Sequence, residues 1–167
     1  MSQKLSIVIP VFNEAKTIHR ILDSISKVEL IGGIQKELVI VDDCSRDNTD
    51  SVLQAYKEHS EMEIQLLRHE INRGKGAALH TGIKQARGDY LIIQDADLEY
   101  DPKDLLRIVS EMEKKNYKII YGSRVLNKSM FKNTQNFTHV VRIWGNVFLT
   151  KVSNFLNNQK LTDAHTC

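Results

Sequence analysis

Short apolar runs recur along the chain at nearly even spacing, and each of them ends in polar residues. They begin at residues 5, 37, 64, 90 and 118. Most are near-continuous Ile, Val and Leu without strict alternation, which is typical of strands buried on both faces of a parallel sheet. The expected strands are LSIVIPVF (5–12), ELVIVDD (37–43), IQLLRH (64–69), YLIIQDAD (90–97) and KIIYGSRV (118–125).

Helical patterns lie between these runs. Their markers are Ile18, Ile21, Leu22 and Ile25; then Val52, Leu53 and Tyr56 after an Asp50 cap; then Leu79, Ile83 and Ala86 before a terminating Gly88; and finally Leu105, Val109 and Met112 after an Asp101-Pro102 start. Strands that alternate with helices at this spacing predict an open α/β fold. We expect a mostly parallel sheet with helices on both faces.

Charge is distributed unevenly along the 167 residues, whose net charge is only +2. Residues 1–113 contain 14 Lys/Arg and 20 Asp/Glu, whereas residues 114–167 contain nine Lys/Arg and a single acid, Asp163. Such asymmetry indicates that one part of the chain meets an anionic partner. We therefore divide the chain into an α/β domain over 1–125 and a basic segment over 126–167, and we expect this second region to be cut short.

Residues 137–156 form an amphipathic pattern with Trp144 and Phe148 on its apolar side. This helix could lie in a membrane interface, or it could pack on the sheet or on a second copy of the chain. The absence of acids from 114 to 162 favours an anionic surface. Sparse basic residues argue against nucleic acid as the partner. No window of about 18 apolar residues occurs, so we expect no membrane crossing.

Polar residues at the strand ends carry the functional information, because ligands of open α/β sheets bind beyond the carboxyl ends of the strands. Asp95-Ala96-Asp97 follows an apolar run, and two carboxylates so close together favour a divalent cation between them. Glu99 could add a third ligand; the alternative is a solvated acidic loop. Asp42-Asp43 could accept hydrogen bonds from a nucleobase or ribose, or could form an Asx turn or helix cap.

Two further segments suit phosphate. Residues 72–76 (NRGKG) combine glycines, a following helix and Lys75, although a flexible turn is as good an interpretation. Gly122-Ser123-Arg124 could place a guanidinium on a phosphate or in a structural ion pair. The Walker A and GxGxxG orders are absent, and the histidines show no zinc-site spacing. Cys44 and Cys167 predict reduced thiols of a cytosolic protein rather than a disulfide.

Taken in order, these motifs resemble those of the family 2 glycosyltransferases of the GT-A fold. The resemblance rests on residues 7–14 (IVIPVFNE), 39–49 (VIVDDCSRDNT), 72–78 (NRGKGAA), 95–99 (DADLE) and 122–124 (GSR). Residues 161–167 (LTDAHTC) look like the TDxxTG/C motif of dolichol-phosphate mannose synthases and related polyprenyl-phosphate glycosyltransferases. The resemblance covers nearly the whole chain.

The resemblance implies a role for each matching residue. Pro10, Phe12 and Glu14 would line the nucleotide pocket, with Asp43 at the base, Lys75 close to the nucleotide, and Asp95, Ala96 and Asp97 at the ribose and diphosphate. It also implies Mg²⁺ or Mn²⁺ held by Asp97 together with Asp95 and Glu99. Asp97, Arg124 on a phosphate and Asp163 at the acceptor or as a base would be the catalytic residues.

The implied reaction inverts the sugar while moving it from a GDP- or UDP-sugar to a polyprenyl phosphate at the cytoplasmic face of a membrane. An alternative is a sugar-hydroxyl acceptor in cell-wall or capsule synthesis, although the QxxRW motif of those relatives is absent. A third reading is a nucleotide-binding module without turnover.

Overall fold

The computed structural model describes residues 3–97, 101–115, 119–120, 122 and 137–162. The elements are β1 (Lys4–Val11), α1 (Ile18–Ser26), the 3-10 turn η1 (Ile31–Gly33), β2 (Gln35–Asp42), α2 (Thr49–His59), β3 (Glu63–Arg68), α3 (Lys75–Gln85), β4 (Tyr90–Ile93), α4 (Asp104–Lys115) and α5 (Phe137–Asn157). The first four predicted strands are therefore present. The fifth, over 118–125, lies largely outside the described residues.

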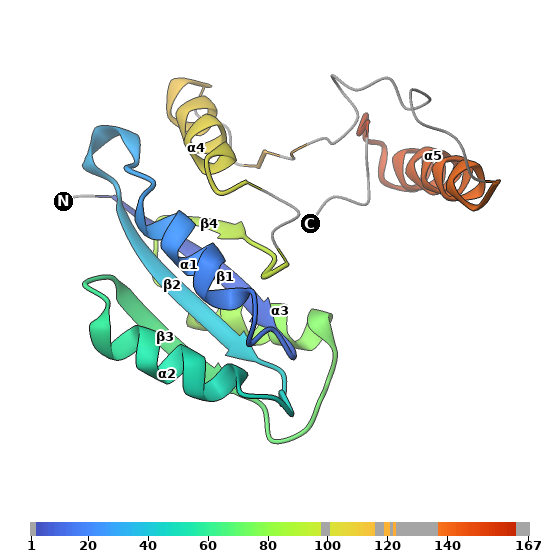
Figure 1. Ribbon diagram of the computed structural model, residues 1–167. Coiled ribbons are helices and arrows are strands. Elements are labelled where there is room, and N and C mark those ends of the chain that lie inside the picture. Colours follow the sequence, from blue (N-terminus) through green and yellow to red (C-terminus); the bar gives the residue numbers. More distant parts are fainter. Residues whose placement is uncertain (1–2, 98–100, 116–118, 121, 123–136, 163–167) are drawn as a thin grey trace. The chain divides into compact units, whose positions relative to one another are not determined.

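The strands form one sheet in the order β3-β2-β1-β4, and every neighbouring pair is parallel (Figure 1). β1 is central, with Val8 opposite Val39 on one side and Ile93 on the other. The chain thus winds outward from β1 in one direction through β2 and β3, then crosses back to place β4 on the other side. This arrangement confirms the predicted α/β fold with a parallel sheet.

One face of the sheet carries the larger part of the core. Alternate residues of β1 point into it, and α1 and α2 cover it (Figure 1). The α1 stripe predicted from the sequence is fully buried there, and Leu105 and Val109 of α4 join the same cluster. Burial of a large aliphatic side chain is worth about 1.5–3 kcal/mol, so this face supplies most of the stabilisation of the sheet.

The opposite face is covered by α3, which packs unusually close. Ala78 is fully buried, and a Cβ built on Gly82 would lie only 2.5 Å from Cγ1 of Val8. The helix that Leu79 and Ile83 mark in the sequence is present, but these two residues are not its buried ones, since Leu79 is only partly buried and Ile83 is 45% exposed. Small residues face the sheet instead because they let the helix backbone approach it.

Three predicted helix ends also differ from the structure. Asp50 does not cap α2; it lies in the first turn, because the helix already begins at Thr49. Gly88 does not end α3, because Ala86 is already extended. α4 begins at Asp104, two residues after Pro102, because a turn closed by the Asp104 N–H on the Asp101 carbonyl precedes it.

At the amino-terminal edge of the sheet, a buried carboxylate ties β1 and β2 to the start of β4. Glu37 accepts hydrogen bonds from the Ser6 hydroxyl at 2.5 Å and from the Arg87 N–H at 2.6 Å. The Ser6 hydroxyl in turn accepts from the Gly88 N–H. Burial by itself raises the pKa of Glu37, but these hydrogen bonds outweigh it and hold the pKa below its ordinary value.

Residues Met1–Tyr117 and Lys118–Cys167 form two compact units. Within the second unit, α5 confirms the predicted helix and ends before Asn158, whose φ of 50° suits a helix terminus. Its exposed apolar side chains include Trp144, Phe148, Phe155 and Leu156. In the part of the chain that the structure describes, no helix is long and apolar enough to cross a membrane. The domain boundary at 125/126 stays a prediction.

Candidate functional site

A cavity of about 360 Å³ opens where β1, β2 and β4 end and α3 begins. Its lining consists of Pro10, Val11, Phe12, Glu14, Asp43, Asn72, Gly74, Lys75, Ala78, Asp95, Ala96 and Asp97. All eight residues expected at the nucleotide are among them. The fold therefore brings together four segments that are far apart in the sequence, although the role of each residue stays a prediction. Glu99, Arg124 and Asp163 lie outside the described residues.

Asp43, which lines the cavity, is held by several hydrogen-bond donors. Its carboxylate accepts hydrogen bonds from the backbone N–H of Arg73 at 2.9 Å and of Gly74 at 2.6 Å, and from Nδ1 of His69 at 2.6 Å. Burial alone raises the pKa of Asp43, but these donors outweigh it and lower the pKa below its ordinary value. The Asp43 carboxylate is thus an ionised hydrogen-bond acceptor with a fixed orientation in the cavity lining.

Also in the cavity lining, the first residue of α3 pairs with the loop after β4. Nζ of Lys75 lies 2.7 Å from Oδ1 and 2.9 Å from Oδ2 of Asp95. The Asp95 side chain is 10% exposed and that of Lys75 is 51% exposed. The Lys75 side chain is therefore half exposed within the cavity lining, where its ammonium group can meet an anion as well as Asp95.

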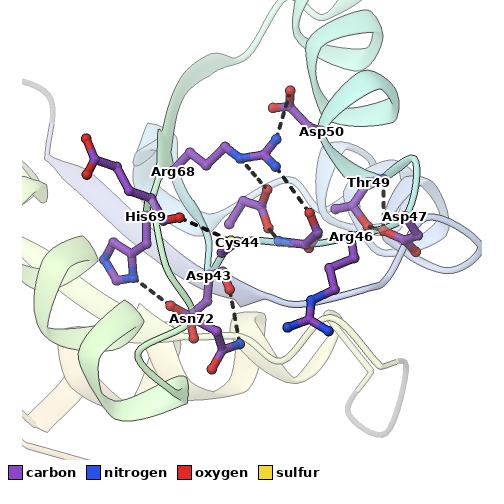
Figure 2. A network of polar contacts seen from close by, with 12 residues as sticks. Asp43, Cys44, Arg46, Asp47, Thr49, Asp50, Arg68, His69 and Asn72 are labelled. Atoms are coloured by element: carbon purple, nitrogen blue, oxygen red, sulfur yellow. Dashed lines mark hydrogen bonds and ion pairs between the residues drawn. The ribbon is translucent and has the colours of Figure 1, made fainter.

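Residues 45–49, which follow β2, hold the loop after β1 in place, and we call them the bracing loop (Figure 2). Its side chains accept hydrogen bonds from three successive backbone N–H groups of the first loop. The pairs are Asn13 N–H to Ser45 Oγ at 2.8 Å, Glu14 N–H to Thr49 Oγ1 at 2.9 Å and Ala15 N–H to Asp47 Oδ2 at 3.2 Å. In return, the Arg46 N–H donates to Asn13 Oδ1 at 2.8 Å. This bracing positions Phe12 and Glu14 on the cavity.

Asp42 points away from the cavity and serves the scaffold. Its carboxylate is 2% exposed, accepts the Ser45 N–H at 2.9 Å and lies 3.6 Å from Nε of Arg68. Arg68 also reaches Asp50 at 3.1 Å and the Ser45 carbonyl at 3.1 Å (Figure 2). Of the two acids that end β2, only Asp43 lines the cavity. An Asx turn, the alternative interpretation of this segment, is formed a few residues later by Asp47, whose side chain accepts the Thr49 N–H.

The donor chemistry of the cavity fits a divalent cation. Asp95 and Asp97 follow β4 and line the same wall, and carboxylate oxygens are the ligands that Mg²⁺ and Mn²⁺ prefer. No group of three ligating side chains occurs among the residues that the structure describes. Two carboxylates suffice where substrate phosphates complete the coordination shell.

His69 is a residue for which the sequence predicted no role at the site. It directly follows β3, is 8% exposed and contacts Asp43. Its position after an apolar run, at the same sheet edge as Asp43, was the available signal. Val11 and Ala78 also line the cavity and carry no chemical signature in a sequence.

The chain belongs to glycosyl transferase family 2, whose sequence profile matches residues 6–167. The fold is the GT-A fold of these enzymes, as the motifs predicted. The dodecaprenyl-phosphate galacturonate synthase of Rhizobium johnstonii is 32% identical over 123 residues, which cover 74% of this chain and 36% of that protein. The chain spans about half the length of the curated relatives it matches, from 36% to 62% in three of them.

Solved structures of similar proteins contain nucleotide-sugars. A mannosyltransferase from Pyrobaculum calidifontis in complex with GDP-Man and Mn²⁺ has a TM-score of 0.59 and 29% identity, over 67% of this chain and 33% of that one. S. aureus TarS in complex with UDP-GlcNAc has a TM-score of 0.60 and 26% identity, over 78% of this chain and 38% of that one.

Proposed function

We propose that the chain carries the donor-binding part of a metal-dependent glycosyltransferase, which moves a sugar from a nucleoside-diphosphate sugar to a polyprenyl phosphate. The observation that carries the proposal is the cavity at the strand ends, where Asp43, Lys75, Asp95 and Asp97 come together. The cavity volume of about 360 Å³ lies in the range of small-molecule sites. The family and the nucleotide-sugars bound by similar structures support the same reading.

The acidic and basic residues that line the cavity suit the two parts of a nucleotide donor. Asp43, fixed and ionised, would accept hydrogen bonds from the N–H groups of a base, beside Pro10 and Phe12. Lys75 would meet the diphosphate, because it is a half-exposed cation in the cavity lining. We expect the base to be guanine or uracil, since similar structures contain GDP-Man or UDP-GlcNAc.

A divalent cation, Mg²⁺ or Mn²⁺, would be held by Asp95, Asp97 and Glu99. It would supply positive charge to the diphosphate as that group leaves. Lys75 and, beyond the described residues, Arg124 would add further positive charge to the leaving group. A phosphate acceptor is already ionised and needs no strong base, so Asp163 would orient the acceptor more than deprotonate it.

The acceptor half of the proposal rests on the relatives and on α5. The Rhizobium relative is a dodecaprenyl-phosphate galacturonate synthase. α5 contains no Asp or Glu and exposes Trp144, Phe148 and Phe155, with Lys151 exposed as well. Apolar side chains beside a basic one suit the surface of an anionic membrane, where a polyprenyl phosphate resides. We therefore propose that the protein acts at a membrane surface, which the family resemblance implies is the cytoplasmic face.

The test measures nucleotide binding and sugar transfer separately. The thermal stability of the protein is recorded with GDP, UDP, GDP-mannose and UDP-GlcNAc, each with and without Mn²⁺. Asp97→Asn is the test variant, and Asp104→Asn, an exposed acid on α4, is the matched control. We expect one nucleotide class to stabilise wild type and Asp104→Asn only with metal, and to leave Asp97→Asn unchanged.

Transfer is then assayed with the preferred donor and polyprenyl phosphate in vesicles. Product formation supports the whole proposal, whereas transfer to a sugar hydroxyl alone replaces the lipid acceptor with the glycan one. Binding without any transfer or hydrolysis supports a nucleotide-binding module. If no nucleotide stabilises the protein with any metal, the donor-binding role is wrong.

A further inference from the structure

His69 is a buried histidine to which the proposed function assigns no role. Its backbone N–H donates to the Asp42 carbonyl at 2.9 Å, which extends the pairing of β3 with β2 by one residue. Both of its ring nitrogens are engaged: Nδ1 lies 2.6 Å from Oδ1 of Asp43, and Nε2 lies 2.9 Å from Oγ1 of Thr81 in α3. A ring held at both nitrogens has a fixed orientation (Figure 2 shows His69 and Asp43).

The direction of the hydrogen bond follows from the charge of Asp43. Its backbone donors and His69 keep the pKa of Asp43 below the ordinary value despite burial, so the carboxylate is ionised at neutral pH. An ionised carboxylate only accepts hydrogen bonds, hence Nδ1 of His69 carries the hydrogen and donates it. Among the described contacts of the Asp43 carboxylate, His69 supplies the side-chain donor and residues 73–74 supply backbone donors.

The backbone donors and the side-chain donor reach Asp43 from different parts of the fold. Arg73 and Gly74 belong to the turn that starts α3, whereas Thr81 fixes His69 from the middle of that helix. Asp43 is thereby tied to two points along α3, and α3 also carries Lys75 to Asp95. Loss of the His69 contact would leave the Asp43 carboxylate held by the backbone donors of residues 73–74 alone, and so less firmly fixed at the cavity.

We propose that His69 is a positioning residue for the nucleotide donor, acting through Asp43 and held in place by Thr81. The proposal rests on the proposed function, in which the cavity binds a nucleoside diphosphate. His69 does not touch the nucleotide itself. His69 fixes the Asp43 carboxylate, which would accept hydrogen bonds from the base. Loss of His69 should therefore weaken nucleotide binding more than it lowers the stability of the fold.

Two substitutions of His69 separate this role from simple packing. The amide nitrogen of Asn overlays roughly on Nδ1 of His, and that of Gln overlays roughly on Nε2. His69→Asn therefore keeps a donor towards Asp43, whereas His69→Gln keeps only the contact with Thr81. Thr81→Val removes the hydroxyl that fixes the ring without changing the shape of the side chain. His80→Gln, an exposed histidine next to Thr81 in α3, is the matched control.

The dissociation constants of GDP and UDP in the presence of Mn²⁺ are measured by calorimetry on the full chain, together with the melting temperature without ligand. His69→Gln should weaken the preferred nucleotide about tenfold or more, the value of one hydrogen bond to a charged group. His69→Asn should stay within about threefold of wild type, and Thr81→Val should lie between the two. His80→Gln should match wild type.

The proposal is overturned if His69→Gln and Thr81→Val bind the nucleotide as wild type does, even where their melting temperatures fall. It is also overturned if His69→Asn and His69→Gln weaken binding equally, because retention of the donor then makes no difference. If His69→Gln does not fold, the comparison of Thr81→Val and His69→Asn with wild type decides in the same way. Failure of wild type to bind either nucleotide is a different result, which removes the proposed function and this inference with it.

Discussion

Gly82 marks the closest approach of α3 to the sheet, and a single methyl group tests it. A Cβ at this position would lie 2.5 Å from Cγ1 of Val8 and 3.2 Å from Cγ2 of Val41. Carbon atoms in contact are normally about 3.5–4.0 Å apart. Gly82→Ala therefore requires α3 and β1 to separate by about 1 Å.

Two opposing effects decide the sign of the stability change. Ala is favoured over Gly inside a helix by about 1 kcal/mol. Overpacking a core costs about 1–3 kcal/mol, and the upper part of that range applies because Val8 and Val41 are fully buried and cannot turn away. We expect a net loss of about 1–2 kcal/mol, which lowers the melting temperature of a chain of this size by about 2–8 °C.

The displacement should also reach the cavity. Lys75 begins α3, and its Nζ is held 2.7 Å from Asp95, so a shifted helix weakens that pair and the binding of nucleotide with it. Urea unfolding measures the stability change, and calorimetry with GDP and UDP measures the binding change. Gly76→Ala on the same helix is the control, because nothing lies within 4 Å of its added Cβ and the substitution should stabilise. Equal stability of the two variants would refute the reasoning.

Other substitutions test the remaining contacts. A double-mutant cycle of Lys75→Met and Asp95→Asn should give a coupling free energy of about 1–2 kcal/mol. This exceeds the value for exposed pairs, because Asp95 is mostly buried. A coupling below about 0.3 kcal/mol means that solvent screens the pair. Asp47→Ala should cost about 1 kcal/mol for each hydrogen bond lost from the bracing loop, and an unchanged urea midpoint argues against the bracing. Glu37 has a lowered pKa, so its ionised form stabilises the fold above the ordinary carboxyl pKa, and this stability is lost as the pH falls through the lower folded value. The melting temperature of Glu37→Gln should therefore fall less than that of wild type between about pH 5 and pH 3. Identical pH profiles of the two proteins would contradict this account.

The sequence predicted the cavity well because strand ends are easy to locate. Apolar runs end abruptly at Phe12, Asp43 and Asp95, and the parallel sheet then gathers these ends at one edge. What the sequence did not predict were contacts between segments whose neighbourhood depends on strand order. The pair of Lys75 and Asp95 requires β4 to lie beside β1, and nothing in the two segments alone indicates this.

The packing face of α3 was not predicted for a related reason. Periodicity marks the helix by its large apolar residues, here Leu79 and Ile83, and gives no sign that small residues face the sheet. The helix packs through Ala78 and Gly82 because these small residues let its backbone approach Val8 of β1 and Val41 of β2 closely. The position of His69 after an apolar run indicates a role only once its partners, Asp43 and Thr81, are known.

The bracing loop has a consequence for exchanging parts between relatives. The N–H groups of residues 13–15 find their acceptors on residues 45–49, so the two loops are one unit although about thirty positions separate them in the chain. Asn13 and Cys44 both have positive φ, 58° and 64°, and such backbone is costly unless its surroundings hold it. A hybrid that inherits residues 12–17 from one parent must inherit 43–49 from the same parent. Otherwise the exchanged loop lacks the hydrogen-bond acceptors on residues 45–49 that hold its backbone conformation.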